Sequence, residues 1–259
     1  MIKLKALDAY LCHLLKSDTI KDYCCNGIQL EGKLDINFIA TAVTASLATI
    51  EAAAALEVDA LIVHHGLFWD KEPHYIRGAK KEKLEILLKK GISVLAYHLP
   101  LDCHQELGNN WLAAKHLGWN DLQPFGMGGG LSLSVALGVK GRFPPVSVEK
   151  FKQQLEAYYE HPAHAALGGK GGSKGMVSSG AIISGGAYEF TPEAAAAGVD
   201  CFVTGNFDEP AWHMAHEEKI HFFAMGHSAT ERVGPKALAA HIAQKFSMRA
   251  EFIDIANPF

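Results

Sequence analysis

The chain has 259 residues, a formal net charge of −4 at pH 7, and 49% hydrophobic against 20% charged residues. This length can bury the core of one large domain or two smaller ones, and the slightly acidic balance disfavours a polyanion as the main partner. No run of about 18 apolar residues is present, so no membrane span is expected. Met1–Leu7 lacks the apolar core of a secretory signal. The five cysteines contain no C-x-x-C pair and are expected to be reduced thiols, which predicts a cytoplasmic location.

In chain order, the spacing of apolar residues predicts helices that alternate with strands up to residue 117. The predicted helices are 2–16, Ala45–Glu57, Gly78–Lys90 and Asn109–Leu117, and the predicted strands are Ile36–Thr44, Asp59–Val63 and Ile92–Tyr97. Strands alternating with helices are typical of an α/β architecture.

A proline and four glycines in Gln123–Gly130 predict a break in the chain. Beyond it, strands are expected at Leu131–Val139 and Met176–Ser184, with a helix at Ser147–Tyr159 between them. The segment Gly168–Gly172 is rich in glycine and contains a lysine, but it lacks the spacing of a P-loop or a dinucleotide-binding fingerprint. A flexible turn is therefore favoured there over a phosphate-binding loop.

The chain also contains an internal repeat. The matching segments are Glu51–Ala55 with Val58-Asp59, and Glu193–Ala197 with Val199-Asp200, each followed by an apolar strand. Roughly 30 residues later, about the length of one βαβ unit, each copy has a second apolar strand that ends at a histidine. An acidic residue follows four positions on, giving His98 with Asp102 and His227 with Glu231. The repeat predicts two similar α/β halves.

Three predicted strand ends carry residues that could bind metal, and ligands of open α/β sheets bind at the carboxyl ends of strands. The predicted ligand set is His64, His65, Asp102, His227 and Glu231. Nitrogen and oxygen donors without thiolates suit Zn, Fe, Mn, Ni or Co better than Ca or Mg. Five ligands exceed the three of one catalytic zinc, so two divalent ions are predicted, with Glu231 the first choice for the bridging carboxylate and Asp102 the second. Two such ions would activate a water molecule for hydrolysis.

Each residue also has a structural alternative. Adjacent histidines on a strand point to opposite faces, unless Gly66 lets the chain turn directly after them. Asp102 fits a turn or a helix N-terminus, and Glu231 fits a capping box in which it bonds the N–H of Ser228. The convergence of several such residues favours the metal site. His98 has no required ligand role there and is predicted to be a general acid or base, with a packed structural histidine as the alternative.

These motifs resemble those of the GTP cyclohydrolase I type 2 homologues, also called the NIF-three-like family, over essentially the whole chain. The resemblance is carried by Asn26–Leu30, His64–Trp69, Tyr97–Asp102, Gly108-Asn109 and Gly226–Glu231. It implies two similar, interleaved α/β domains with mixed sheets, expected at 1–124 plus 228–259 and at 125–227. By resemblance, the five predicted ligands match the dinuclear metal ligands of the family. The resemblance is to the short bacterial form, and it implies a ring-shaped homohexamer whose sites face an internal cavity.

Two further residues enter through the resemblance. Thr204-Gly205-Asn206 departs from the Thr-Gly-Glu or Thr-Gly-Asp of many relatives, which implies a weaker contact near the site or a different substrate preference. His213 matches a histidine often found near the site, where it would support a ligand.

The resemblance implies a metal-dependent hydrolase acting on a nucleotide or a related small molecule. The reaction in the family name is water attack at C8 of GTP with loss of formate. Two alternatives stay open: a metal-binding scaffold or regulatory interaction protein without catalytic turnover, and another metallohydrolase such as a phosphatase or peptidase. The first alternative requires a regulatory protein partner. The acidic balance disfavours direct nucleic-acid binding, although a strand held inside a ring stays open.

Overall fold

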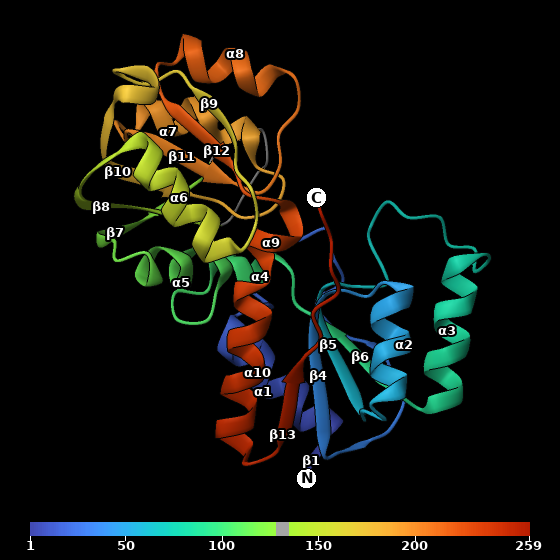
Figure 1. The fold of residues 1–259 in the computed structure, drawn as a ribbon. Coiled ribbons are helices and arrows are strands. Elements are labelled where there is room, and N and C mark those ends of the chain that lie inside the picture. The colour runs from blue at the N-terminus through green and yellow to red at the C-terminus, as the bar shows by residue number, and fades with distance from the viewer. Residues whose placement is uncertain (128–134) are drawn as a thin grey trace. The chain divides into compact units, whose positions relative to one another are not determined.

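A computed structural model describes residues 1–127 and 135–259, and it shows an α/β protein with mixed sheets (Figure 1). The chain forms two compact units. Unit 1 comprises Met1–Leu101 and Gly234–Ala256, and unit 2 comprises Asp102–Val233 and Asn257–Phe259. The domain boundaries expected from the sequence, near residues 124 and 228, stay a prediction. Among the described helices, none has the length and apolar character needed to cross a bilayer.

Unit 1 is built on a sheet whose strand order is β13-β4-β5-β6-β2. These strands are β13 (Arg249–Phe252), β4 (Phe38–Thr44), β5 (Ala60–His65), β6 (Ser93–Ala96) and β2 (Gly27–Leu30). The first four run parallel to their neighbours, and β2 is antiparallel to β6. A separate pair is formed by β1 (Ile2–Lys3) and β3 (Asp35–Ile36). Because parallel strands end at one edge of a sheet, β5 and β6 bring their C-terminal residues together.

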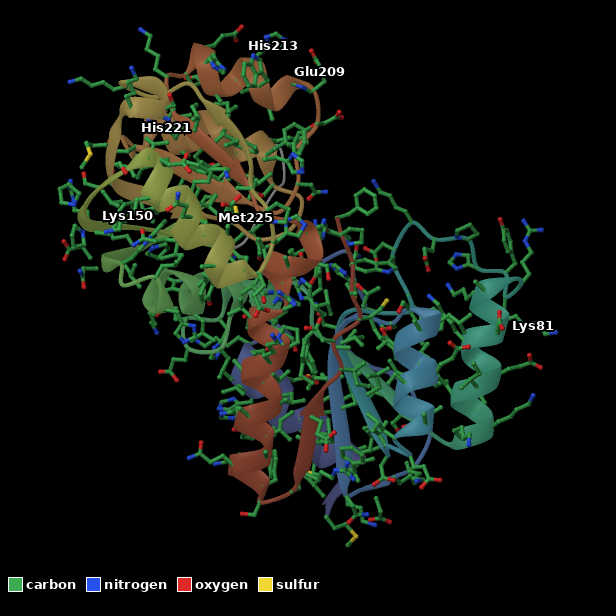
Figure 2. The ribbon with its side chains drawn as sticks, in the orientation of Figure 1. Lys81, Lys150, Glu209, His213, His221 and Met225 are labelled. Carbon is green, nitrogen blue, oxygen red and sulfur yellow. The ribbon has the colours of Figure 1, made fainter. Side chains whose placement is uncertain are left out.

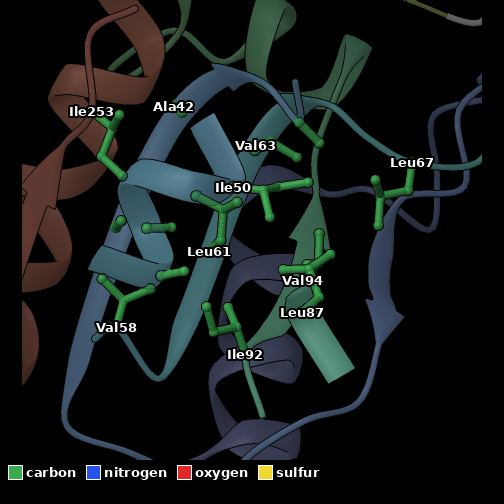
Figure 3. Close-up of a cluster of buried hydrophobic side chains, with 14 of the residues drawn as sticks. Ala42, Ile50, Val58, Leu61, Val63, Leu67, Leu87, Ile92, Val94 and Ile253 are labelled. Atoms are coloured by element: carbon green, nitrogen blue, oxygen red, sulfur yellow. The ribbon is translucent and has the colours of Figure 1, made fainter. Parts of the chain in front are cut away.

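Helices cover both faces of this sheet. They are α1 (Leu4–Leu15), α2 (Leu47–Ala55), α3 (Ala79–Lys90) and α10 (Val233–Phe246). Ile50 of α2 and Leu87 of α3 pack on Leu61 and Val63 of β5, and Figure 3 shows this core. Thr41 lies between Ala40 and Ala42 of this core, so its side chain points to the opposite face of the sheet. Its hydroxyl donates to the backbone carbonyl of Pro235, which shows that α10 packs on that face.

Unit 2 is built on a second mixed sheet with the strand order β7-β8-β10-β11-β12-β9. The strands are β7 (Asn120–Phe125), β8 (Gly138–Ser147), β10 (Met176–Ile182), β11 (Cys201–Thr204), β12 (His221–Ala224) and β9 (His164–Leu167). Strands β10, β11 and β12 run parallel, and β7, β8 and β9 pair antiparallel with their neighbours.

Two expectations for this region need correction. The break predicted at Gln123–Gly130 begins too early, because β7 continues through Pro124 to Phe125. A proline is tolerated there because β7 is the edge strand of the sheet and its outer N–H groups need no partner. The strand predicted at Leu131–Val139 lies partly outside the described residues, and β8 begins at Gly138.

The helices of unit 2 are α4, α5, α6, α7, α8 and α9. Their bounds are α4 (Leu99–Cys103, whose first residues belong to unit 1), α5 (Asn109–His116), α6 (Val148–Tyr159), α7 (Thr191–Ala196), α8 (Pro210–Glu217) and α9 (His227–Glu231). Short 3-10 turns occupy Gly172–Lys174 and Tyr188–Phe190. In the glycine-rich loop, a Cβ on Gly169 would collide with the buried imidazole of His221, so close packing explains that glycine.

The internal repeat is confirmed by equivalent hydrogen bonds in the two units. In unit 1, Asp59 Oδ2 accepts from the backbone N–H groups of Asn37 at 2.8 Å and Phe38 at 3.1 Å. In unit 2, Asp200 Oδ2 accepts from the backbone N–H groups of Ser178 at 2.8 Å and Ser179 at 3.0 Å. Each aspartate therefore ties the start of one parallel strand to the start of its neighbour.

The strand register changes one detail of the repeat. Ser93 pairs with Ala60 in unit 1, and His221 pairs with Cys201 in unit 2. Ser93 and His221 therefore occupy equivalent positions. His98 follows Ser93 by five residues, and the residue that follows His221 by five is Gly226, one position before His227. The sequence match between His98 and His227 is therefore one residue out of register, and the two histidines have different places in their units.

Candidate metal centre

Three imidazoles gather at the carboxyl end of the parallel strands in unit 1. His64 and His65 end β5, and His98 follows shortly after β6. The ring centroid of His64 lies 4.7 Å from that of His65 and 4.9 Å from that of His98. One nitrogen from each ring lies within 4.8 Å of the others, so this cluster could hold a metal ion. The adjacent histidines converge, although strand alternation alone would separate them.

Close packing, rather than a left-handed turn, explains the glycine that follows them. Strand β5 ends at His65, and the φ of Gly66 is not positive, so the chain leaves the strand without a left-handed residue. A Cβ on Gly66 would collide with the amide of Gln29. That amide accepts from the backbone N–H of Leu67 at 2.6 Å and donates to the carbonyl of Cys25 at 2.8 Å. Gln29 thereby holds the backbone directly after His65.

His98 is held by residues from a loop far earlier in the chain. Its Nδ1 lies 2.9 Å from Asp22 Oδ1, and its backbone N–H donates to Asn26 Oδ1 at 2.9 Å. Burial raises the pKa of the Asp22 carboxyl, but contacts with the imidazole of His98 and with Asn26 outweigh burial and hold that pKa at about 2. Asp22 is thus a buried carboxylate that fixes the orientation of His98. Asn26 belongs to a motif visible in the sequence, whereas no sequence pattern marks Asp22.

The three histidines predicted as ligands share one arrangement, in which Nδ1 contacts a protein oxygen. His64 Nδ1 lies 3.3 Å from the carbonyl of Tyr97, and His65 Nδ1 lies 3.0 Å from Thr44 Oγ1. In unit 2, His227 Nδ1 lies 3.1 Å from Asn206 Oδ1. The Tyr97 carbonyl and the Asn206 amide oxygen can only accept, so they favour the tautomer of His64 and His227 with the proton on Nδ1 and the lone pair on Nε2, whereas the Thr44 hydroxyl can either donate to His65 or accept from it. Metal-binding histidines are typically oriented in this way.

Unit 2 carries two buried carboxylates close to one another. A carboxylate oxygen of Asp102 lies within 4.8 Å of one of Glu231, and both residues are buried. Glu231 Oε1 also lies 3.2 Å from His227 Nε2. Asp102 Oδ1 accepts from Asn109 Nδ2 at 2.8 Å and from the hydroxyl of Ser184 at 3.0 Å. Carboxylate oxygens in this arrangement are ligands of the type that divalent cations bind.

The backbone of Gly185 lies directly against Glu231 and His227. Its φ is +68°, and a Cβ on it would collide with Glu231 Oε1 and lie 3.2 Å from His227 Nε2. Its backbone N–H donates to Thr230 Oγ1 at 3.0 Å, which holds the loop against α9. The backbone therefore approaches the carboxylate as closely as only glycine permits. The imidazole and carboxylate donors of the predicted set are of the types that divalent transition metals prefer.

The structure does not support the capping-box alternative for Glu231. The backbone N–H of Ser228 donates to the carbonyl of Phe259 at 3.3 Å, and α9 has no side-chain cap at its N-terminus. The glutamate is instead directed to His227, one turn earlier on the same helix. His213 lies on α8 and is largely exposed. Its Nε2 lies 3.1 Å from Glu209 Oε1, and Glu209 is not one of the predicted ligands.

The sequence marked the supporting residues unequally: Asn109 belongs to the Gly108-Asn109 motif, whereas nothing marked Asp22 or Ser184 as site residues. Asn109 and Ser184 hold Asp102 from different parts of unit 2, and Asp22 holds His98 in unit 1. Asn206 occupies the position at which the family resemblance implied an acidic residue in many relatives. It keeps an oxygen acceptor for His227 Nδ1 but supplies no negative charge.

The fold and these groups define a class, namely α/β proteins of two mixed-sheet units that carry His/Asp/Glu clusters able to hold metal ions. Within that class, the family model Duf34/NIF3 (NGG1p interacting factor 3) matches residues 2–258. The chain belongs to this family.

Curated relatives and solved structures agree with this assignment. A "GTP cyclohydrolase 1 type 2 homolog" from Chlamydia muridarum is 49% identical over 251 residues, with 96% of each chain covered. A protein with the same name from Pasteurella multocida is 41% identical over 253 residues, which cover 97% of this chain and 98% of that one. A structure described as "protein ybgI, unknown function" matches with a TM-score of 0.91 at 37% identity, and TTHA1606 from Thermus thermophilus matches with 0.89 at 33%; both cover 100% of each chain.

Proposed function

We propose that the protein is a dinuclear metal-dependent hydrolase acting on a nucleotide or a related small molecule, with His64, His65, Asp102, His227 and Glu231 as the metal ligands. One observation carries the proposal. Each predicted imidazole ligand is anchored through Nδ1, and the two predicted carboxylate ligands are buried near one another. Two divalent ions, when bound, would act as Lewis acids and increase the acidity of water. The curated name of the relatives supports the nucleotide assignment.

In this proposal His98 transfers the protons of the reaction. Asp22 fixes its Nδ1, so proton exchange takes place at Nε2, and the negative charge of Asp22 stabilises the imidazolium that forms. Tyr23 and Trp69 lie beside it, with ring centroids 5.0 Å and 5.1 Å from that of His98. Tyr23 is about half exposed, so these rings offer a surface on which a planar base can stack. This surface supports a nucleotide over a purely aliphatic substrate.

Metal content tests the ligand assignment. Elemental analysis of the native protein should find close to two equivalents of divalent transition metal per chain. His65→Ala and Glu231→Ala should each lose at least one equivalent and abolish turnover while the fold, measured by circular dichroism, is kept. His74→Ala is the matched control, because His74 is exposed and is no predicted ligand. Native protein without stoichiometric metal under metal-replete conditions would contradict the assignment.

The products identify the reaction. Purine nucleotides incubated with metal-loaded protein should release formate if the chemistry is that of a cyclohydrolase, and chelation should stop the release. Release of phosphate instead would indicate a phosphatase. Activity that survives complete removal of metal would refute a metal-dependent mechanism.

The family description as an interacting factor favours one second candidate, a metal-binding scaffold or regulatory protein without turnover. Failure of a broad nucleotide screen, together with a stable partner recovered equally by wild type and by Glu231→Ala, would support it. For either function we propose a cytoplasmic homohexamer. Analytical ultracentrifugation should then find six times the 28.0 kDa mass of the chain.

A further inference from the structure

A pocket of about 410 Å³ lies in unit 2, apart from the predicted metal ligands. Its floor contains Ala166 of β9 and Phe222 of β12, which pair across the two strands and therefore share one face of the sheet. Its walls are Ala211 and Trp212 of α8 and the loop 207–209 that leads into this helix. Small alanine side chains on both the floor and the wall leave the space between sheet and helix open.

Two exposed aromatic side chains line this pocket and are held in place by histidines. Phe207 is 49% exposed and Trp212 is 56% exposed, although both are large and apolar. The indole of Trp212 lies 4.3 Å from the ring of His216, and the ring of Phe207 lies 5.1 Å from that of His164. Exposed apolar groups gathered around a hollow typically mark a binding site. Each of the two rings thus lies against a histidine ring at the edge of the pocket.

The polar groups of the pocket favour a positive charge. Asp208 and Glu209 contribute carboxylates to its lining, His164 and His213 contribute imidazoles, and none of the described residues that line it is lysine or arginine. Figure 2 shows Glu209 and His213 next to each other near the start of α8, and their side chains are 3.1 Å apart. Aromatic faces attract cations through the ring quadrupole, and the carboxylates add Coulomb attraction.

We propose that this pocket binds a small organic cation, namely an amine, guanidinium or quaternary ammonium group on an apolar stem. The head group would lie against Phe207 and Trp212 near the carboxylates, and the stem would contact Ala166 and Phe222. A volume of about 410 Å³ is within the range of small-molecule sites. None of the described residues that line the pocket is a predicted metal ligand, so cation binding here does not require bound metal.

Calorimetric titration with benzyltrimethylammonium and agmatine tests the proposal, with benzyl alcohol as the neutral comparison. Both cations should bind saturably and the alcohol should not. Trp212→Ala and Glu209→Gln should each weaken binding by roughly fivefold, the size expected for one cation–π or charge contact. The matched controls are Glu218→Gln, an exposed acid at the end of α8 that does not line the pocket, and Tyr75→Ala, an exposed aromatic residue of unit 1. Neither should change the affinity.

Chelator-treated protein should bind the cations as well as untreated protein, so failure of the proposed metal site would leave this result intact. Equal binding of benzyl alcohol, or affinity unchanged in Trp212→Ala, would overturn the proposal. A Phe207→Ala/Trp212→Ala double variant should sediment like wild type. A change in its oligomeric state would show that the aromatic pair is a subunit contact and would equally overturn the assignment to a small cation.

Discussion

Asp22 determines which nitrogen of His98 can exchange protons, because its carboxylate is 2.9 Å from Nδ1 and its own pKa is held at about 2. Asp22→Asn keeps an oxygen acceptor but removes the charge that stabilises the imidazolium. We expect turnover to fall by roughly 10–100-fold, the usual effect of removing a group that orients a catalytic or ligating histidine. Two-dimensional ¹⁵N NMR should show a changed tautomer population for His98, while metal content stays at the wild-type level.

The exposed aspartate four residues earlier provides the control for this variant. Asp18→Asn should leave both the NMR signals of His98 and turnover unchanged. If Asp22→Asn instead loses metal, then Asp22 supports the ligands directly, and the role assigned to it as a positioning residue for proton transfer is wrong.

Comparing Gly185 with Gly198 separates the effect of close packing from that of backbone strain. Gly185 and Gly198 have similar positive φ values, +68° and +72°, but only a Cβ on Gly185 meets other atoms, those of Glu231 and His227. Both substitutions to alanine should cost about 1–2 kcal/mol of stability from the left-handed backbone. Gly185→Ala alone should also displace the carboxylate of Glu231 and reduce metal content, as measured by elemental analysis. Equal metal content in both variants would show that metal binding does not depend on the close approach of Gly185 to Glu231.

The candidate ligands could be predicted from the sequence because metal chemistry restricts residue type, and strand ends restrict position. His64, His65 and His98 follow apolar runs, so their shared location was predictable. Asp22 was not, because it comes from a loop whose sequence carries no periodicity, and Ser184 was predicted only as the last residue of a strand. Tertiary packing alone brings such supporting residues to the site.

At the scale of elements, the repeated aspartate at the start of a parallel strand links two strands in each unit. Asp59 accepts two backbone N–H bonds and lies 2.6 Å from Lys33 Nζ. Burial raises the pKa of Asp59, but the contacts with Lys33 and the backbone outweigh burial and lower it. Asp59→Asn should reduce the free energy of unfolding at pH 7 by roughly 1.5–3 kcal/mol, the usual range for hydrogen bonds to a charged group.

The pH dependence of that loss follows from the lowered pKa of Asp59. Its stabilisation is complete above the unfolded-state pKa of about 3.9 and disappears as the pH falls through the lower folded-state value. Urea unfolding of wild type and Asp59→Asn should therefore differ most at neutral pH and converge in strong acid. Asp35→Asn, in an exposed pair with Lys3, is the control and should change stability by less than about 1 kcal/mol. A constant difference across pH would mean that the charge of Asp59 is unimportant.

Elements with strong apolar periodicity were predicted within a few residues, whereas short edge strands were not. Helix α1 was predicted because leucines recur on one face, and it begins two residues late only because Ile2–Lys3 pair with β3. Strands β7 and β9 were missed, since half-exposed edge strands carry mixed sequences and β7 contains a proline. Their structure depends on the neighbouring strand more than on their own residues.

At the scale of the whole molecule, the chain runs from unit 1 into unit 2 and back again. The sequence repeat predicted two similar α/β halves, and the equivalent bonds of Asp59 and Asp200 confirm them. The exact match between the halves could not be predicted, because one additional residue before His227 shifts the register and only the strand pairs reveal it.

At this scale, metal bound by the proposed ligands would stabilise the folded protein, because the unfolded chain does not hold these side chains together. A ligand that binds only the folded state stabilises it by about 2.7 kcal/mol at a hundred times its dissociation constant, which for a chain of this size raises Tm by roughly 5–10 °C. Differential scanning calorimetry should therefore find a lower Tm for the chelated protein than for the metal-loaded protein. Glu231→Ala should melt like the chelated wild type and should not respond to added metal, whereas His74→Ala should respond fully. A Tm that is identical with and without metal would contradict metal binding by the proposed ligands.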